Sequence, residues 1–77
     1  MGTDFLGNGL DGFVITEISD LEGGYYYYGY IHRTGKVLIM REKQDESEYK
    51  YADGGHNDFD GVWAIRDTLT YKRWDKV

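Results

Sequence analysis

The chain has 77 residues and a formal net charge of −5, and it contains no cysteine and no proline. A domain of this size buries only about 60% of the surface that its unfolded chain exposes, and without cysteine no disulfide reinforces the thin core. The acidic balance argues against a nucleic acid as partner, and no apolar run approaches the roughly 20 residues of a membrane span.

Residues 1–12 are rich in glycine and predict a flexible N-terminal arm. Phe5 and Leu6 are apolar anchors within this arm, and the segment lacks the basic head and apolar core of a signal peptide. We therefore expect residues 13–77 to form a single small β domain that is made in a cytoplasm.

Alternating apolar and polar residues predict four strands, at 13–18, 25–32, 36–41 and 48–52. Gly35 lies where a short hairpin between the second and third strands needs a left-handed residue. The third strand is apolar on both faces, so it should be the most central one. In the fourth strand Tyr49 and Tyr51 should point inward, because they alternate with charged residues.

The second strand contains the run YYYYGY at 25–30. Side chains alternate between the two faces of a strand, so Tyr25 and Tyr27 should share one face, and Tyr26, Tyr28 and Tyr30 the other. The core of the chain explains one tyrosine face. The second needs another cover, which is more of the same chain, a ligand or a neighbouring subunit.

The C-terminal third mixes two periodicities. Residues 53–58 read as a tight loop, after which the apolar residues recur at helical spacing, while 68–71 alternate as in a strand. We predict a short helix near 60–66 with Asn57 or Asp58 as N-cap, and a last strand at 68–74. The expected fold is all-β, a small antiparallel barrel or sandwich of about five strands with one short helix, closed by that last strand.

Chemically reactive side chains are sparse. The sequence has two serines and two histidines, and it lacks the motifs of nucleophilic catalysis, so we predict no enzyme activity. The loop at 53–60 holds acids that could surround a calcium ion, but it lacks the regular ligand spacing of an EF-hand and has the composition of a sharp turn. We predict no metal and no cofactor.

Arg66 follows Trp63 by three positions and would share its helix face. We expect its guanidinium to stack on the indole ring or to pair with a nearby aspartate.

Several motifs occur in a fixed order: YYYYGY, IMR, YADG at 51–54, and FDGVW…R..LTY at 59–71. Together they resemble a group of small virion-associated proteins of tailed bacteriophages and prophages, with the pattern YYGY…YADG…FDxVWxxRxxLTY. The likeness spans about 25–71. The chain departs from it at Val37, where tryptophan is expected, and at Ala64-Ile65, where an acidic pair is expected. The resemblance implies a role in the virion and no chemistry.

The functional prediction combines this resemblance with the second tyrosine face. We expect a structural component of a phage particle, a minor capsid, decoration, tail or fibre-associated subunit, that contacts other virion proteins or copies of itself as a homo-oligomer or within a larger assembly. The alternative is a carbohydrate- or receptor-binding β module that uses exposed tyrosines. The predicted interface residues are Tyr26, Tyr28, Tyr30, Phe5, Leu6 and Trp63.

Overall fold

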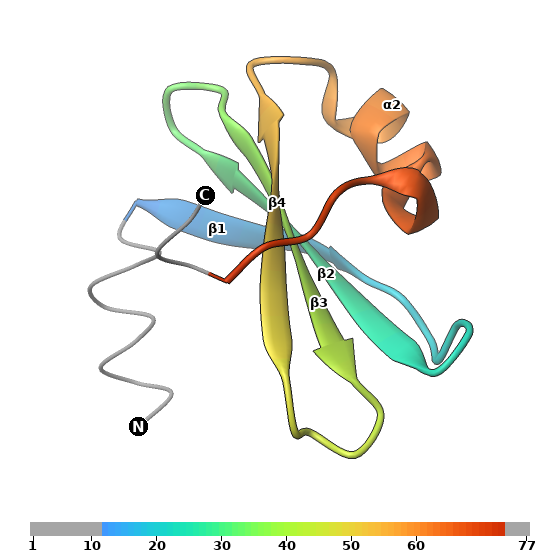
Figure 1. The fold of residues 1–77 in the computed structure, drawn as a ribbon. Helices are drawn as coiled ribbons and strands as arrows, with labels where there is room; N and C mark the ends of the chain where they lie inside the picture. Colours follow the sequence, from blue (N-terminus) through green and yellow to red (C-terminus); the bar gives the residue numbers. More distant parts are fainter. Residues whose placement is uncertain (1–11, 74–77) are drawn as a thin grey trace.

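The structure, a computed structural model, describes residues 12–73. Four strands follow one another along the chain: β1 (Phe13–Ile18), β2 (Tyr25–His32), β3 (Val37–Lys43) and β4 (Tyr49–Gly55). Helix α2 (Phe59–Ala64) and the 3₁₀-helix η1 (Arg66–Thr68) come after them. The strands form one antiparallel sheet in the order β1-β2-β3-β4 (Figure 1).

The sheet is made by residues that favour strands. Tyrosine, valine and isoleucine supply most of β1 to β3, and their bulky side chains pack well on a pleated surface. Gly35 adopts a φ of +94° in the hairpin between β2 and β3, which confirms the predicted left-handed position. The central position of β3 is also confirmed, because it lies between two strands and its residues Val37 to Met40 are all buried.

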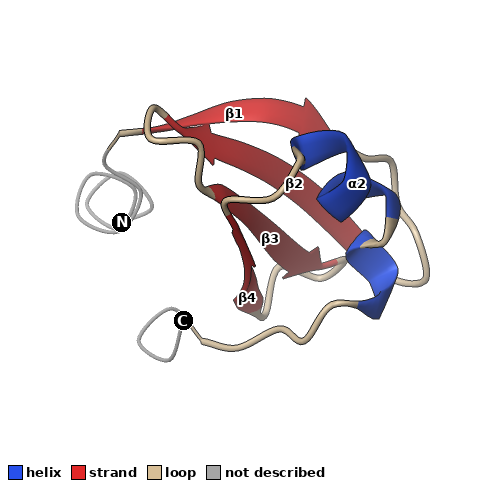
Figure 2. Cartoon of the chain, turned by 90° about the horizontal axis from the view of Figure 1, so that it is seen from above, coloured by secondary structure: helices blue, strands red, loops and turns tan. Residues whose placement is uncertain are grey.

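Two clusters of buried side chains lie on opposite faces of the sheet. One face carries Tyr27, Val37 and Ile39, which pack against Val62 of α2. The other carries Tyr30, Leu38, Met40 and Tyr51. Figure 2 shows α2 and η1 on one side of the curved sheet, so only the first cluster lies under the helix.

Helix α2 packs very close to the sheet because the strand residues beneath it include two glycines, which have no side chain. A Cβ atom at Gly29 would lie 2.6 Å from the ring of Phe59 and 3.0 Å from that of Trp63, and one at Gly54 would lie 3.0 Å from Val62. The carboxylate of Asp58 caps the helix by accepting a hydrogen bond of 3.0 Å from the backbone N–H of Gly61. The predicted cap at Asp58 is thus confirmed, and the helix occurs close to the predicted range.

The predicted closed barrel or sandwich is wrong, because the described part of the chain forms an open sheet of four strands. The segment predicted as a fifth strand, 68–74, begins at the last residue of η1, and Trp74 lies outside the described residues. Within 69–73, Lys72 alone pairs with β4, through hydrogen bonds of 2.7 and 2.8 Å to Tyr51. The hydroxyl of Tyr71 donates to the carbonyl of Arg66 over 2.7 Å, which ties this segment to the helix side.

The predicted loop at 53–58 is also shorter than expected. Strand β4 continues to Gly55, since an irregularity in its pairing with β3 accommodates one extra residue: Val37 pairs with Gly55, and Leu38 pairs with Asp53. Such a bulge lets a strand continue past a residue that has no partner.

Candidate functional site

Strand β2 distributes its tyrosines as the alternation predicts. Tyr25 and Tyr27 lie on the helix side, where Tyr27 is buried and Tyr25 packs beside it. Tyr28 and Tyr30 lie on the opposite side with the second buried cluster, and Tyr26 shares their side because it lies two positions from Tyr28. Tyr30, which we expected at an interface, is only 8% exposed and is therefore covered within the chain.

The sheet face opposite α2 carries a set of accessible aromatic and aliphatic side chains. Tyr26 and Tyr28 are half-buried, and Tyr49 of β4 is 46% exposed. Ile15 and Ile18 of β1 pair with Tyr30 and Tyr28 and so point to the same side. We call this surface the tyrosine face; its members are Tyr26, Tyr28, Tyr49, Ile15 and Ile18.

A buried carboxylate lies within the tyrosine face. Glu42 is 8% exposed, and one of its oxygens accepts a hydrogen bond of 2.6 Å from the hydroxyl of Tyr28. Burial, followed by this hydrogen bond, raises the pKa of Tyr28 far above its usual value. The hydroxyl of Tyr28 is therefore satisfied within the chain.

Sequence reasoning missed Tyr49 as a surface residue, since it placed Tyr49 inward beside Tyr51. Both residues point to the same side of β4, but Tyr51 lies under its neighbours at 1% exposure, whereas Tyr49 is paired with Glu42 near the strand end. The alternation along a strand shows which face of the sheet a side chain lies on, but not how deeply it is buried. No sequence signal therefore distinguished exposed Tyr49 from buried Tyr51.

Trp63, also predicted at an interface, lies on the helix side of the sheet and packs against residues of that side. Its indole ring stacks on Phe59 with centroids 5.9 Å apart, and the guanidinium of Arg66 lies 4.4 Å from the ring centroid. The predicted stacking of Arg66 on Trp63 is confirmed, but its acidic partner is Glu22, at 2.7 and 3.1 Å, rather than an aspartate. Phe5 and Leu6 lie outside the described residues.

A second arginine on the helix side contacts two tyrosines. The guanidinium carbon of Arg41 lies 4.2 Å from the ring centroid of Tyr25 and 4.5 Å from that of Tyr71. Each contact is a cation–π interaction. These contacts fix the C-terminal segment above β3 and leave the tyrosine face on the other side of the sheet.

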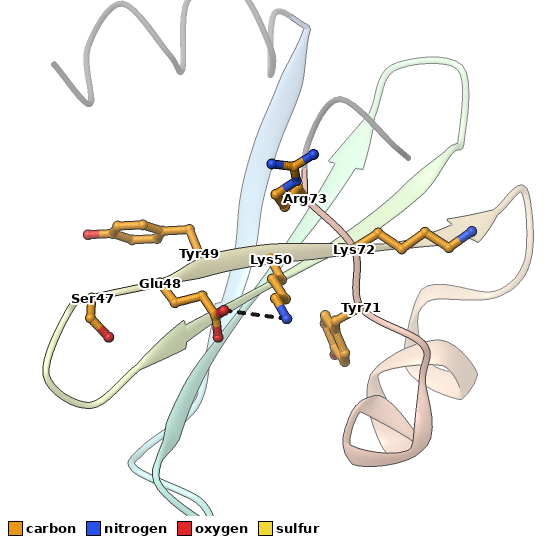
Figure 3. A pocket seen from close by; sticks show the side chains of 7 residues that line it. All are labelled: Ser47, Glu48, Tyr49, Lys50, Tyr71, Lys72 and Arg73. Carbon is orange, nitrogen blue, oxygen red and sulfur yellow. Dashed lines mark ion pairs between the residues drawn. The ribbon is translucent and has the colours of Figure 1, made fainter.

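The first residues of β4, the two residues before them and residues 71–73 line a shallow pocket. Lys50 forms an ion pair of 3.4 Å with Glu48, and Figure 3 shows the ring of Tyr71 on the other side of the Lys50 side chain. Three cationic side chains and one carboxylate give this pocket a positive balance. Its lining residues are Ser47, Glu48, Tyr49, Lys50, Tyr71, Lys72 and Arg73.

Two of the three acids at 53–60 have structural partners. Asp53 accepts a hydrogen bond from the backbone N–H of Gly55 and pairs with Lys36 at 3.3 Å, and the first of these contacts is the main cause of its lowered pKa. Asp58 caps α2. Among residues 12–73, the structure brings no group of three potential metal-ligating acids, histidines or cysteines together. Neither described helix has the length and apolar character to cross a membrane.

Burial of the tyrosines predicts a loss of stability at alkaline pH. The pKa values of six tyrosines are raised, with burial as the largest cause in each: Tyr27, Tyr28, Tyr30, Tyr49, Tyr51 and Tyr71. A raised folded-state pKa contributes stability that is complete below the unfolded value of about 10 and is lost as the pH rises above it.

We therefore expect the phenols of the buried and half-buried tyrosines in this set to ionise only as the chain unfolds, above about pH 10; they are Tyr27, Tyr28, Tyr30, Tyr51 and Tyr71. The absorbance of tyrosinate and the circular dichroism of the sheet should change together in a pH titration. In concentrated urea the same phenols should ionise near their ordinary pKa. Gradual ionisation near pH 10 with an intact sheet would contradict this expectation.

Comparison with protein-family models, curated proteins and solved structures finds no match for this chain. We therefore infer its function from its surface and from the motif resemblance described above.

Proposed function

We propose that this chain is a non-enzymatic structural subunit of a tailed-bacteriophage particle that acts through protein–protein contacts on its tyrosine face. The observation that carries the proposal is the set of accessible aromatic and aliphatic side chains on the sheet face opposite α2. The motif resemblance supports the virion as its location, in a capsid, decoration, tail or fibre-associated position.

The chemistry of the tyrosine face suits a protein partner. Tyrosine is enriched in interface cores, because its ring adds large contact area while its hydroxyl tolerates partial hydration. Ile18 is 58% exposed and Ile15 is 45% exposed, and they extend the aromatic surface with aliphatic area. Exposed aromatic and aliphatic side chains of this kind are typical of interaction sites. Other virion proteins or further copies of the chain are the proposed partners.

Replacing two exposed tyrosines tests this function. We expect Tyr26→Ser with Tyr49→Ser to weaken assembly by tenfold or more, because truncating a central interface aromatic costs more than about 1 kcal/mol per residue. The measurements are sedimentation of the purified chain and its recovery in particles of the phage that encodes it. Thermal melting should show that the variant remains folded.

Two further variants serve as controls. Ile65→Ser removes an apolar side chain that is 50% exposed on the helix side, and it should leave assembly unchanged. Tyr27→Ser opens a hole in the buried cluster under α2 and should unfold the chain. Normal incorporation of the double tyrosine variant would refute the proposal, and glycan-array binding that this variant loses would favour the carbohydrate-binding alternative.

A further inference from the structure

The two edges of the open sheet differ in charge. Along the β1 edge, Glu17 and the following Asp20 are exposed and carry negative charge. At the opposite edge, residues 71–73 run beside β4, where Lys72 and Arg73 are exposed and Lys50 lies in the same pocket. We call the first the acidic edge and the second the basic edge.

Each edge also offers apolar contact area. Beside the acidic charges, Val14 is 65%, Ile18 58% and Leu21 42% exposed. At the basic edge the ring of Tyr71 lies beside the Lys50 side chain, whereas the ring of Tyr49, which also lines the pocket, points away from both (Figure 3). An exposed edge strand with this much apolar surface is a site at which another chain can associate.

We propose that the acidic edge of one copy contacts the basic edge of the next copy, so that copies join head to tail. This inference rests on the proposed function, because it adds a contact between the edges of neighbouring copies to the contacts that the subunit makes through its tyrosine face. The occupant of each edge is a second copy, since the same chain carries both complementary surfaces.

Charge decides between this arrangement and a two-fold dimer. In a contact between two acidic edges, Glu17 and Asp20 would face the same residues of the partner, and two basic edges would bring the lysines together. Like charges placed opposite one another are destabilising. Contact between unlike edges instead brings carboxylates to ammonium and guanidinium groups.

The backbone of β1 also favours a contact made by side chains. Its pairing with β2 shifts register between Ile15 and Glu17, which breaks the regular spacing of the strand. Bulges of this kind disfavour a long continuous ladder with another strand. A head-to-tail contact repeats from copy to copy and closes into a ring or extends into a filament, as suits a particle subunit.

Charge reversal on each edge tests the contact. In one variant Glu17→Lys with Asp20→Lys makes both edges basic, and in the other Lys72→Glu with Arg73→Glu makes both edges acidic. We expect each purified variant alone to associate at least tenfold more weakly than the wild type in sedimentation experiments. An equimolar mixture should assemble again, with the two variants alternating, because every contact then joins unlike edges.

The mixture excludes a folding defect as the explanation, because two misfolded chains would not restore assembly. Asp60→Lys with Asp67→Lys is the matched control for the first variant, since it makes the same change in net charge as Glu17→Lys with Asp20→Lys but on the exposed helix side. This control should assemble as the wild type does.

Wild-type assembly that both variants retain, or that mixing fails to restore, would overturn the head-to-tail contact alone and leave the proposed function standing. A wild-type chain that stays monomeric in solution and is absent from purified particles would overturn both.

Discussion

Gly29→Val is expected to unfold the protein or to lower its melting temperature by more than about 15 °C. A Cβ atom at Gly29 would lie 2.6 Å from Cζ and 2.8 Å from Cε1 of Phe59, closer than real Cβ contacts, and the ring of Trp63 lies 3.0 Å away. Overpacking of this kind costs about 1–3 kcal/mol for small additions, and each kcal/mol shifts the melting temperature of a domain this size by about 4–8 °C.

The stabilising effects of replacing Gly29 are smaller than the steric cost. Replacing glycine inside a strand removes conformational freedom from the unfolded chain, which favours folding by about 0.5–1 kcal/mol. Valine also suits a strand better than glycine. The steric conflict exceeds these gains because α2 would have to move away from the sheet, which would separate Val62 from the cluster that it shares with Tyr27.

Gly61→Ala provides the matched control. Gly61 lies in α2, and its φ is not positive. A Cβ atom added at Gly61 would lie 3.7 Å from Oδ2 of Asp58, which is an ordinary van der Waals distance. Alanine should therefore stabilise the helix by up to about 1 kcal/mol. Gly29→Val is measured beside it by thermal and urea unfolding, and equal stability of the two variants would contradict the close contact between helix and sheet.

Arg66→Ala is expected to cost about 2–3 kcal/mol of unfolding free energy, because this one side chain joins the β1–β2 turn to the end of α2. Its Nε and Nη2 donate to the two carboxylate oxygens of Glu22 at 3.1 and 2.7 Å, and its Nη1 donates to the carbonyl of Trp63 at 2.8 Å. Hydrogen bonds to charged groups contribute about 1.5–3 kcal/mol when they are shielded from water.

Partial exposure limits this value. The side chains of Arg66 and Glu22 are 21% and 39% exposed, so solvent screens their ion pair, and the Coulombic part alone contributes little. The two parallel hydrogen bonds and the stacking on Trp63 add geometric specificity that a simple ion pair lacks. The loss should therefore come mainly from the fixed geometry rather than from charge.

Arg66→Lys distinguishes these contributions, because lysine keeps the charge but lacks the planar fork. We expect it to recover less than half of the loss. Urea unfolding of Arg66→Ala, Glu22→Ala and the double variant gives the coupling energy between the two residues. Additive effects would show that the ion pair does not connect the β1–β2 turn with the end of α2.

Local sequence signals predicted much of the sheet. Alternation located β1 and β2 to the residue, Gly35 marked the hairpin, and the doubly apolar run of β3 indicated its central place. Asp58 was recognisable as a helix cap because aspartate there accepts a backbone hydrogen bond. These features depend on neighbours in the sequence, so the sequence contains their signal.

Other features depend on partners distant in the sequence. Arg66 finds Glu22 across 44 positions, and Tyr71 bonds to Arg66, so the segment expected to close a barrel instead folds back over the helix side. Residues 68–71 alternate as a strand does, but alternation does not indicate whether a segment forms hydrogen bonds with a neighbouring strand or with another part of the fold.

The sequence by itself determined the mostly β character, the hairpin order and the division of the tyrosines between two faces, because side-chain parity and turn residues act locally. Only the tertiary structure decided that the sheet stays open, that Tyr30 is covered while Tyr49 is exposed, and that acidic and basic charges gather on opposite edges. The burial of each side chain, the closure of the sheet and the charges at each edge depend on which strands and helices lie side by side. That arrangement depends on contacts between distant residues, such as the packing of α2 on Gly29 and the contact of Arg66 with Glu22.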